Sequence, residues 1–550
     1  MRPPLSPSPT RRRQRSRKRT SRSKPPPNSP SPDSLTNAAG AHAPAVLFWW
    51  GTSGANLNLP RRLPTSRLAR STYICTSPSF AYTYSSCINM ASLLSSRIGS
   101  EHAAALREIR RACKLGALDT DEELRRFWVD TDTARDPERP LVDRILDCLD
   151  DSDDGTRILV YGHGGSGKTT ELSRVAQKLD EHENWFPITF SVRDEMNLAA
   201  VQAEDIFVVL VERLLHAAQN PPPSISDSPL DVKGDHLQPL LDYLSESTVE
   251  TEKSQEKSLA VSAEAAVNTE TVLLKLLKLL GSVKGDIKLS SNHTQTQTLK
   301  LRKRPAELLH HVNMAINAVR LALPSRQRIL FIVEDLDKLD IATAKRVFID
   351  NVNLLAGIKS DIIYTIPIFT YHSHEASNLD NQFSSFGLPM IKVINLDQTR
   401  ANGFKIVREI VIKRIGENAI EPDALDLLVE KTGGVLQHVF EVLFNSALMT
   451  SSTVPLTRDV IGKALKNKQT EFWSDISLPT PAPEGVTLDL LFDRLVECAK
   501  CQLGGKKNHP KIDPIYQILL RCCAIVEYNG DRWYGVHPLV IDNLRELGRL

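Results

Sequence analysis

Residues 157–170 read Arg-Ile-Leu-Val-Tyr-Gly-His-Gly-Gly-Ser-Gly-Lys-Thr-Thr, and we expect the rest of the chain to be built around them. The consecutive apolar residues 158–161 predict a buried strand of a parallel sheet. Residues 162–169 then match G-x-x-x-x-G-K-[ST] at every fixed position. The apolar residues that follow recur at helical spacing: Leu172, Val175, Ala176 and Leu179. A strand, a glycine-rich loop and a helix therefore occur in the order that this motif requires.

The residue types of this loop suit a polyphosphate. Backbone N–H groups at a helix N-terminus point at an anion, and the helix dipole favours its negative charge. Glycine allows the close approach and the positive φ that such a loop needs. Lys168 would reach the β- and γ-phosphates, and the hydroxyl of Thr169 would bind Mg²⁺. The expected nucleotide-binding residues are Gly162, His163, Gly164, Gly165, Ser166, Gly167, Lys168, Thr169 and Thr170.

The expected cofactors are ATP and Mg²⁺. ATP is favoured over GTP because Asn467-Lys-Gln-Thr470 lacks the Asp that would make it a guanine-recognition motif. The competing interpretation, a glycine-rich turn with a chance lysine, leaves the flanking strand and helix unexplained.

A second landmark is the stretch 329–339, which reads Ile-Leu-Phe-Ile-Val-Glu-Asp-Leu-Asp-Lys-Leu. Its apolar residues predict a buried strand, and carboxylates follow where that strand would end, as in a Walker B motif. Glu334 would hold Mg²⁺ through its water shell. Asp335 or Asp337 would orient the attacking water, so these two and Lys168 are the expected catalytic residues. A solvated acidic loop is the alternative, and the alternation of strands and helices around it favours Walker B.

Two more strands are expected at 362–369 and 391–396. Thr365 or Thr370, near the end of the first, could contact the γ-phosphate or make only a local hydrogen bond. Strands that alternate with helices predict an α/β fold with a parallel sheet and flanking helices.

The charge of the chain is distributed unevenly. The net charge is +2 over 550 residues. Residues 1–90 hold fourteen of the 68 Lys and Arg residues and one of the 66 acidic residues, so they carry +13 and the remainder carries −11. A mildly acidic remainder does not favour a broad nucleic-acid-binding surface. No apolar run reaches the roughly 20 residues that span a bilayer.

Residues 1–89 are rich in Pro, Ser and Arg and do not look like a folded domain. Three interpretations stay open: a basic nuclear-localisation or nucleic-acid tail, an organelle transit segment, or a gene model extended upstream of a true start at Met90. Eight cysteines, mostly in apolar periodic stretches, suit a reducing compartment, so we expect a cytoplasmic or nuclear protein.

The expected domains follow from these patterns. A helical segment at 90–150 precedes an ATPase core at 151–400, with an insertion of unknown role at about 221–300. A helical lid at 401–477 and a winged-helix-like domain at 486–550 complete the chain. In the last of these, Asn529-Gly530 between apolar runs is typical of a β-hairpin. Its charges favour a regulatory or protein-contact role over DNA binding.

These strings resemble a known family. Gly162-His-Gly-Gly-Ser-Gly-Lys-Thr-Thr-Glu-Leu172 is similar to the P-loop of AAA-type and STAND-type ATPases, and Glu334-Asp-Leu-Asp-Lys-Leu339 to their Walker B string. Gly433-Gly-Val-Leu436 resembles the start of their helical subdomain, and Trp533-Tyr-Gly-Val-His-Pro-Leu-Val540 the ending of some members. The likeness extends from about Phe127 to the C-terminus.

The resemblance implies an ATPase that acts as a nucleotide-dependent switch, with an unidentified protein partner and a possible homo-oligomer. Two departures point to slow turnover: Glu334 stands where the family has Asp, and Gln437 and His438 stand where many members carry an Arg. A nucleotide-gated scaffold with little turnover is therefore the alternative. A DNA-associated ATPase of the origin-binding kind is a third, weaker one.

Overall fold

The structure is a computed structural model. It describes residues 102–550 except for residue 115 and residues 136–138, 153–154, 182–183, 253–268, 290–303, 325–326, 451–453, 509–511 and 529–532. The expectations for residues 1–89 and for the Asn529-Gly530 turn lie outside the described residues.

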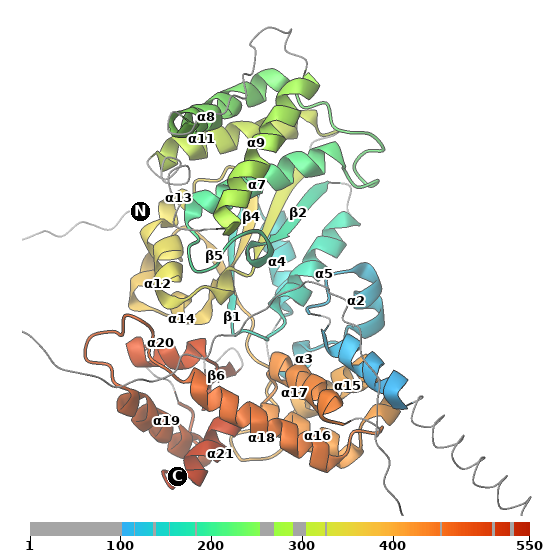
Figure 1. The fold of residues 1–550 in the computed structure, drawn as a ribbon, viewed down its shortest axis with the longest axis vertical. Helices are drawn as coiled ribbons and strands as arrows, with labels where there is room; N and C mark the ends of the chain where they lie inside the picture. The colour runs from blue at the N-terminus through green and yellow to red at the C-terminus, as the bar shows by residue number, and fades with distance from the viewer. Residues whose placement is uncertain are drawn as a thin grey trace, which may run out of the picture. The chain divides into compact units, whose positions relative to one another are not determined.

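A five-stranded parallel sheet forms the centre of the fold (Figure 1). Its order is β2-β3-β4-β1-β5. The strands are β1 (Arg157–Gly162), β2 (Trp185–Ser191), β3 (Arg328–Glu334), β4 (Asp361–Pro367) and β5 (Ser384–Gly387). All seven residues of β4 are buried, as expected of a parallel strand covered on both faces. The expected α/β class with a parallel sheet is confirmed.

Helices cover both faces of the sheet. On one face, Ile158 and Val160 of β1 pack with α4 (Leu141–Asp150) and α5 (Lys168–Asp180). On the other, Leu159 belongs to a core that includes α7 (Ala203–Gln219) and α11 (Pro305–Ala322). Successive side chains of a strand point to opposite faces, so the uninterrupted apolar run of β1 serves both layers.

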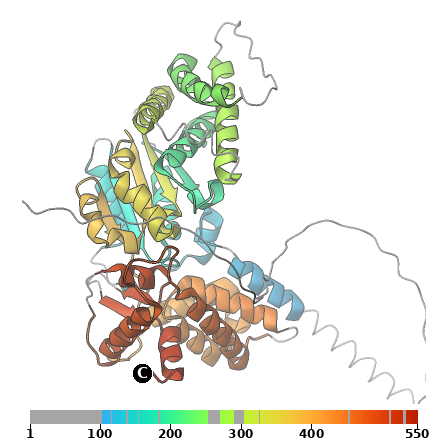
Figure 2. The same ribbon diagram turned by 60° about the vertical axis from the view of Figure 1, so that its left-hand side comes forward.

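Two long helices lie within the expected insertion. Helix α8 (Gly234–Glu252) packs beside α9 (Thr269–Leu289). A helical stripe of α8 is buried: Leu237, Leu240, Leu241 and Leu244. Figure 2 shows these helices and the C-terminal helices on opposite sides of the sheet.

The prediction of a strand at 391–396 is wrong. The fifth strand is β5, which is short and partly exposed, and residues 390–394 form only isolated bridges, Met390 to Tyr528 and Ile394 to Arg400. Ile391 and Val393 are buried outside the sheet, where they lie close to Gly434 of the C-terminal part of the chain.

The remaining elements are short helices and the C-terminal subdomains. Residues 102–114 are helical. The short elements are α2 (Asp121–Phe127), α3 (Asp132–Arg135), α6 (Val192–Glu195), η1 (Leu336–Lys338), α12 (Ile341–Ala344), η2 (Lys345–Asp350), α13 (Val352–Leu355), α14 (Ile368–Tyr371) and η3 (His374–Asn378). The C-terminal elements are α15 (Asn402–Ile415), η4 (Glu417–Ala419), α16 (Pro422–Thr432), α17 (Leu436–Met449), α18 (Arg458–Asp475), α19 (Leu488–Leu503), α20 (Pro514–Arg521), β6 (Ile525–Tyr528), β7 (Trp533–Val536) and α21 (Pro538–Glu546).

The chain ends with two strands and a helix, as the sequence predicted. Strands β6 and β7 pair in antiparallel register, and α21 follows them. Within the residues that the structure describes, no helix is long and apolar enough to cross a membrane.

Candidate functional site

The glycine-rich loop connects β1 to α5 as the motif requires. Gly165 and Gly167 have φ values of 76° and 97°, in the left-handed region that favours glycine. Gly167 is the N-cap of α5. The first backbone N–H groups of this helix have no intrahelical acceptor, so they are available at the end of the loop to bind an anion. The loop therefore has the local geometry of an anion site.

Lys168 is buried inside this loop. Its Nζ donates to the carbonyl oxygens of Gly162 and His163, at 3.0 and 2.8 Å. The same ammonium forms a 2.7 Å ion pair with Oδ2 of Asp337, which lies in η1 just beyond β3. The two landmarks of the sequence thus meet at one edge of the sheet, and Lys168 is the group that joins them.

Glu334 is the last residue of β3 and only 4% exposed. Burial raises the pKa of its carboxyl to about 8; a hydrogen bond with the Thr169 hydroxyl opposes the shift, and the neighbouring Asp335 and Asp337 add to it. Its Oε1 has no hydrogen-bond partner among the described residues. A carboxyl and a hydroxyl oxygen are ligands that Mg²⁺ prefers, so this orphaned oxygen beside Thr169 fits a magnesium ion.

Asp335 and Asp337 have different surroundings. Asp335 has a left-handed backbone, with φ of 66°. Its Oδ2 accepts from the hydroxyl of Ser191 at 2.7 Å, and its Oδ1 pairs with Lys338 at 2.5 Å. Burial raises the pKa of this carboxyl, but the hydrogen bonds from Lys338 and Ser191 lower it, and the net effect is a lowered pKa. Of the two carboxylates, Asp337 is the one that contacts Lys168.

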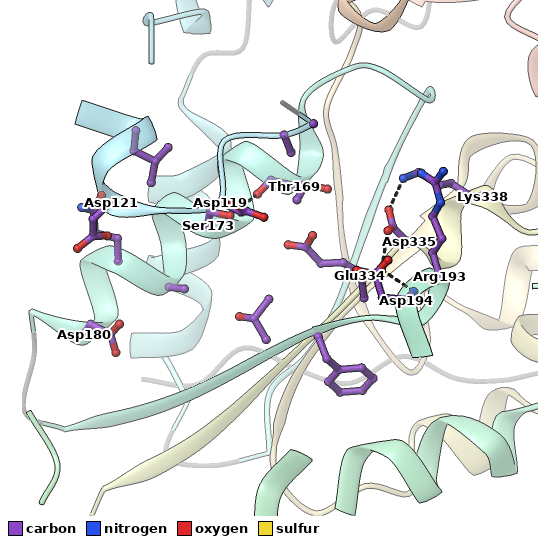
Figure 3. A pocket seen from close by; sticks show the side chains of 18 residues that line it. Asp119, Asp121, Thr169, Ser173, Asp180, Arg193, Asp194, Glu334, Asp335 and Lys338 are labelled. Atoms are coloured by element: carbon purple, nitrogen blue, oxygen red, sulfur yellow. Dashed lines mark hydrogen bonds and ion pairs between the residues drawn. The ribbon is translucent and has the colours of Figure 1, made fainter. Parts of the chain in front are cut away.

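A cavity of about 460 Å³ opens beside Thr169 and Glu334 (Figure 3). One face of α5, the ends of β2 and β3, and the segment 116–124 line it. Its carboxylates outnumber its basic groups, which are Arg193 and Lys338. The acidic residues are Asp119, Asp121, Asp180, Asp194, Glu334 and Asp335. This mostly acidic lining favours a cation in the cavity. The hydrogen-bond donors for an anion lie instead at the glycine-rich loop, next to Lys168.

Three threonines that the sequence singled out, Thr170, Thr365 and Thr370, have different surroundings. Thr365 Oγ1 accepts from the Leu336 N–H at 3.1 Å and donates to the Val333 carbonyl at 3.5 Å, so the local hydrogen bond is the interpretation that the geometry fits. The Thr170 hydroxyl accepts from the Leu118 N–H at 3.1 Å, which ties α5 to the upstream segment. Thr370 is buried in α14.

The C-terminal part of the chain touches the loop directly. Nε2 of His163 accepts from the backbone N–H of Glu527 in β6 at 2.8 Å. Burial lowers the pKa of His163 to about 4, so its ring is neutral at pH 7. A Cβ built on Gly165 would lie 2.7 Å from Cβ of Gln437, near the start of α17. Sequence patterns gave no signal for the contact between His163 and Glu527, whereas the family resemblance had already indicated the position of Gln437.

Of the two positions that correspond to the family's arginine, only Gln437 lies at the loop. His438 is buried instead against His537, with 3.1 Å between its Nδ1 and Nε2 of His537. Neither position supplies a fixed positive charge to the phosphates.

Arg135 is a site residue that the sequence did not indicate. It belongs to α3, upstream of the loop, and its guanidinium donates to the carbonyl oxygen of Ser166 at 2.6 Å. A buried basic residue outside a motif has no periodic or spacing signature. Only the packing of α3 against the loop reveals it.

One comparison with known proteins matches the region that contains this site. Residues 139–366 match the model of the KAP family P-loop domain, a range that contains the glycine-rich loop and Glu334. This part of the chain is therefore a P-loop NTPase domain of the KAP type, and NTP binding with Mg²⁺ is implied. The narrower likeness to AAA-type and STAND-type ATPases stays a prediction.

Curated proteins and solved structures were also compared with the chain. A search of curated proteins finds no match for the chain. Among solved structures, Cdc6p from Pyrobaculum aerophilum is similar at 11% identity, with a TM-score of 0.29, over 77% of this chain and 99% of that chain.

Proposed function

We propose that this protein binds ATP with Mg²⁺, hydrolyses it, and acts as a nucleotide-dependent switch. The observation that carries the proposal is the meeting of Lys168, Thr169, Glu334 and Asp337 at one edge of the sheet. The match of residues 139–366 to a P-loop domain supports nucleotide binding by the same residues.

The proposed chemistry assigns each group a role. The amides of the loop and Lys168 hold the phosphates, and Thr169 and Glu334 hold the metal. When bound, Mg²⁺ neutralises charge that develops on the β- and γ-phosphates. Lys168 leaves its ion pair with Asp337 to reach the phosphates, and this frees Asp337 to accept a proton from water.

Asp337 is the better candidate of the two for orienting water. Both oxygens of Asp335 are held, one by Ser191 and one by Lys338. An aspartate fixed in this way stabilises the turn after β3, whereas Asp337 exchanges its partner when nucleotide binds. We keep Asp335 as the second candidate.

The switch rests on two contacts. His163 accepts a hydrogen bond from β6, and Gly165 packs against α17. If bound phosphates rearrange the loop, the contacts of His163 and Gly165 change with it. A change at the nucleotide would therefore shift both the helical lid at 401–477 and the C-terminal hairpin.

A specific observation favours the alternative of a scaffold with little turnover. Glu334 replaces the shorter Asp, Asp335 is held, and Gln437 faces the loop without a positive charge. Such a site can bind ATP tightly and stabilise the transition state poorly. The same residues support binding in both cases, so only the rate of hydrolysis separates the two functions.

A DNA-associated role is not favoured. Helix α20 lies against α14, where Gln517 Nε2 donates to the Phe369 carbonyl at 3.5 Å, and β6 lies against the loop. The helix and hairpin that a winged helix would present to DNA therefore make contacts within the chain. A protein partner and a homo-oligomer stay predictions.

The test is phosphate release by the full chain with ATP and Mg²⁺, beside Lys168→Ala. Turnover that the substitution abolishes supports the switch ATPase. Tight ATP binding without turnover, lost in Lys168→Ala, supports the scaffold. Absence of binding in the wild type would overturn both.

A further inference from the structure

Arg135 is a buried arginine that the proposed chemistry does not use. It is 2% exposed and ends the short helix α3. Burial of a guanidinium is costly unless its donors find acceptors. The acceptors of its hydrogen bonds therefore indicate the role of the Arg135 side chain.

Three oxygens surround the guanidinium. Nε donates to the Thr131 hydroxyl at 3.0 Å, and Nη2 donates to the Ser166 carbonyl at 2.6 Å. Nη1 donates to the carbonyl of Pro389, in the segment that follows β5. One acceptor is thus a peptide group of the glycine-rich loop itself, and the other two hold the guanidinium against it.

The bond to Ser166 fixes the orientation of a peptide plane. In a trans peptide the C=O and the following N–H point in opposite directions. A guanidinium that holds the Ser166 oxygen therefore also fixes the direction of the Gly167 N–H, on the side of the peptide opposite that oxygen. Gly167 has φ of 97° and can adopt the required conformation without steric cost.

The guanidinium also lies close behind the loop. A Cβ built on Gly167 would be 3.4 Å from Nη2 of Arg135. Burial lowers the pKa of Arg135 to about 10, against the carboxylates of Glu171 and Asp132, so the group stays charged at pH 7. Its positive charge adds to the field of the loop amides without touching a phosphate.

We propose that Arg135 is a positioning residue for phosphate binding, which holds the Ser166–Gly167 peptide with its N–H directed at the nucleotide. This inference rests on the proposed binding of ATP to the loop. It extends the site beyond the P-loop motif to a side chain that lies upstream of it.

A purely structural cross-link is the competing role, because Arg135 also ties α3 to Pro389. The chain offers a matched control. Arg328 is a half-buried arginine at the opposite edge of the sheet, where it pairs with both oxygens of the buried Asp361 at 2.9 and 2.7 Å. Its loss should weaken folding and leave nucleotide affinity unchanged.

The experiment compares Arg135→Lys, Arg135→Ala and the control Arg328→Lys in the full chain. Calorimetry measures the affinity for ATP with Mg²⁺, and thermal unfolding without nucleotide measures folding. We expect Arg135→Lys to bind ATP about ten- to hundredfold more weakly, since hydrogen bonds from a charged donor are lost. Low-millimolar guanidinium, but not equal sodium chloride, should restore affinity to Arg135→Ala. Arg328→Lys should melt earlier and bind ATP normally.

Unchanged ATP affinity in Arg135→Lys overturns the inference, whether or not Arg135→Ala folds. A loss of affinity that guanidinium does not restore, together with an earlier melt like that of Arg328→Lys, also overturns it in favour of a structural cross-link. A wild type that binds no ATP overturns the proposed function and this inference with it. A wild type that binds ATP, with an Arg135→Lys variant that binds more weakly and an Arg135→Ala variant whose affinity guanidinium restores, supports both.

Discussion

Two clusters of ionic side chains, one around Arg328 and Asp361 and one around Lys168 and Glu334, lie at opposite edges of the central sheet, and their hydrogen bonds are satisfied to different degrees. At the edge where the strands begin, Arg328 donates to Asp361 and to the carbonyls of Leu149 and Ser152. Asp361 also accepts from the Thr156 N–H at 2.8 Å. Every oxygen of this carboxylate has a partner.

At the edge where the strands end, the network is incomplete. Lys168 pairs with Asp337, but Oε1 of Glu334 and Oγ of Ser166 have no hydrogen-bond partner among the described residues. Buried polar atoms without partners are costly. A complete network indicates a structural role, and an incomplete one indicates a site that a ligand completes.

The largest effect should come from breaking the complete network. Asp361→Asn removes one charge and leaves Arg328 without its counter-ion, which costs about 3–5 kcal/mol in the free energy of unfolding. Chemical denaturation of the nucleotide-free protein measures this. The folded fraction should keep its ATP affinity, and a variant as stable as the wild type would refute the structural role.

Acid should next destabilise the protein through His438 and His537, a pair that is satisfied only when neutral. His537 Nδ1 accepts from the Leu539 N–H at 3.2 Å, so its Nε2 carries the proton that it donates to His438. Burial lowers the pKa of His438 to about 3 and that of His537 well below its usual value, and Lys468 adds to both shifts.

The sign of the pH effect follows from these directions. Above about pH 6.5 both rings are neutral in the folded and unfolded chain. Below it only the unfolded chain takes up protons, so the free energy of unfolding falls by about 1.4 kcal/mol per pH unit for each ring. Denaturant titrations between neutral and mildly acidic pH measure the slope. Substitution of His438→Gln and His537→Asn together should make the slope shallower, leaving the contribution of His163, whose pKa is also lowered by burial. An unchanged slope would contradict the assignment.

Glu334→Gln should sharpen the comparison, because it removes the carboxyl group that would hold Mg²⁺ at the incomplete edge and keeps the size of the side chain. Burial disfavours the charged form of Glu334, so the amide should leave the nucleotide-free melting temperature unchanged or raise it. Phosphate release with Mg²⁺ should slow by about a hundredfold, since a metal ligand is lost. A variant that melts much earlier, with normal turnover, would mean that Glu334 is a structural residue.

The smallest effect is expected where the loop meets the C-terminal hairpin. His163→Ala removes the acceptor of the Glu527 N–H, and a net hydrogen bond of this kind corresponds to about a three- to tenfold change in rate. We expect faster release of a fluorescent ADP analogue in a chase experiment. His236→Ala, on an exposed position of α8, is the control. Equal release rates in all three proteins would argue against the switch.

Local patterns predicted the central strands and the motif residues well. The apolar runs of β1 and β3 are buried as expected, and the carboxylates that follow β3 lie at the loop because parallel strands end at the same edge. Both features depend on residues that are neighbours in sequence, which is why spacing alone revealed them.

The contacts that the sequence did not reveal join distant segments. Arg135 reaches Ser166, and the Glu527 amide reaches His163, only because α3 and β6 pack against the loop. The prediction of a strand at 391–396 was wrong for a related reason: Ile391 and Val393 are buried next to Gly434, far along the chain, and not in a sheet. Strand β5 escaped notice because Ser384-Ser-Phe-Gly387 is short and half polar.

The central claim is that the incomplete edge of the sheet is completed by ATP and Mg²⁺ at Lys168. Calorimetric titration of the full chain with ATP, with and without Mg²⁺, beside Lys168→Ala, tests it most directly. We expect saturable binding that Mg²⁺ strengthens and that Lys168→Ala weakens by at least about a hundredfold, or about 2.7 kcal/mol. Binding of equal strength in the two proteins, or none in either, would contradict the claim.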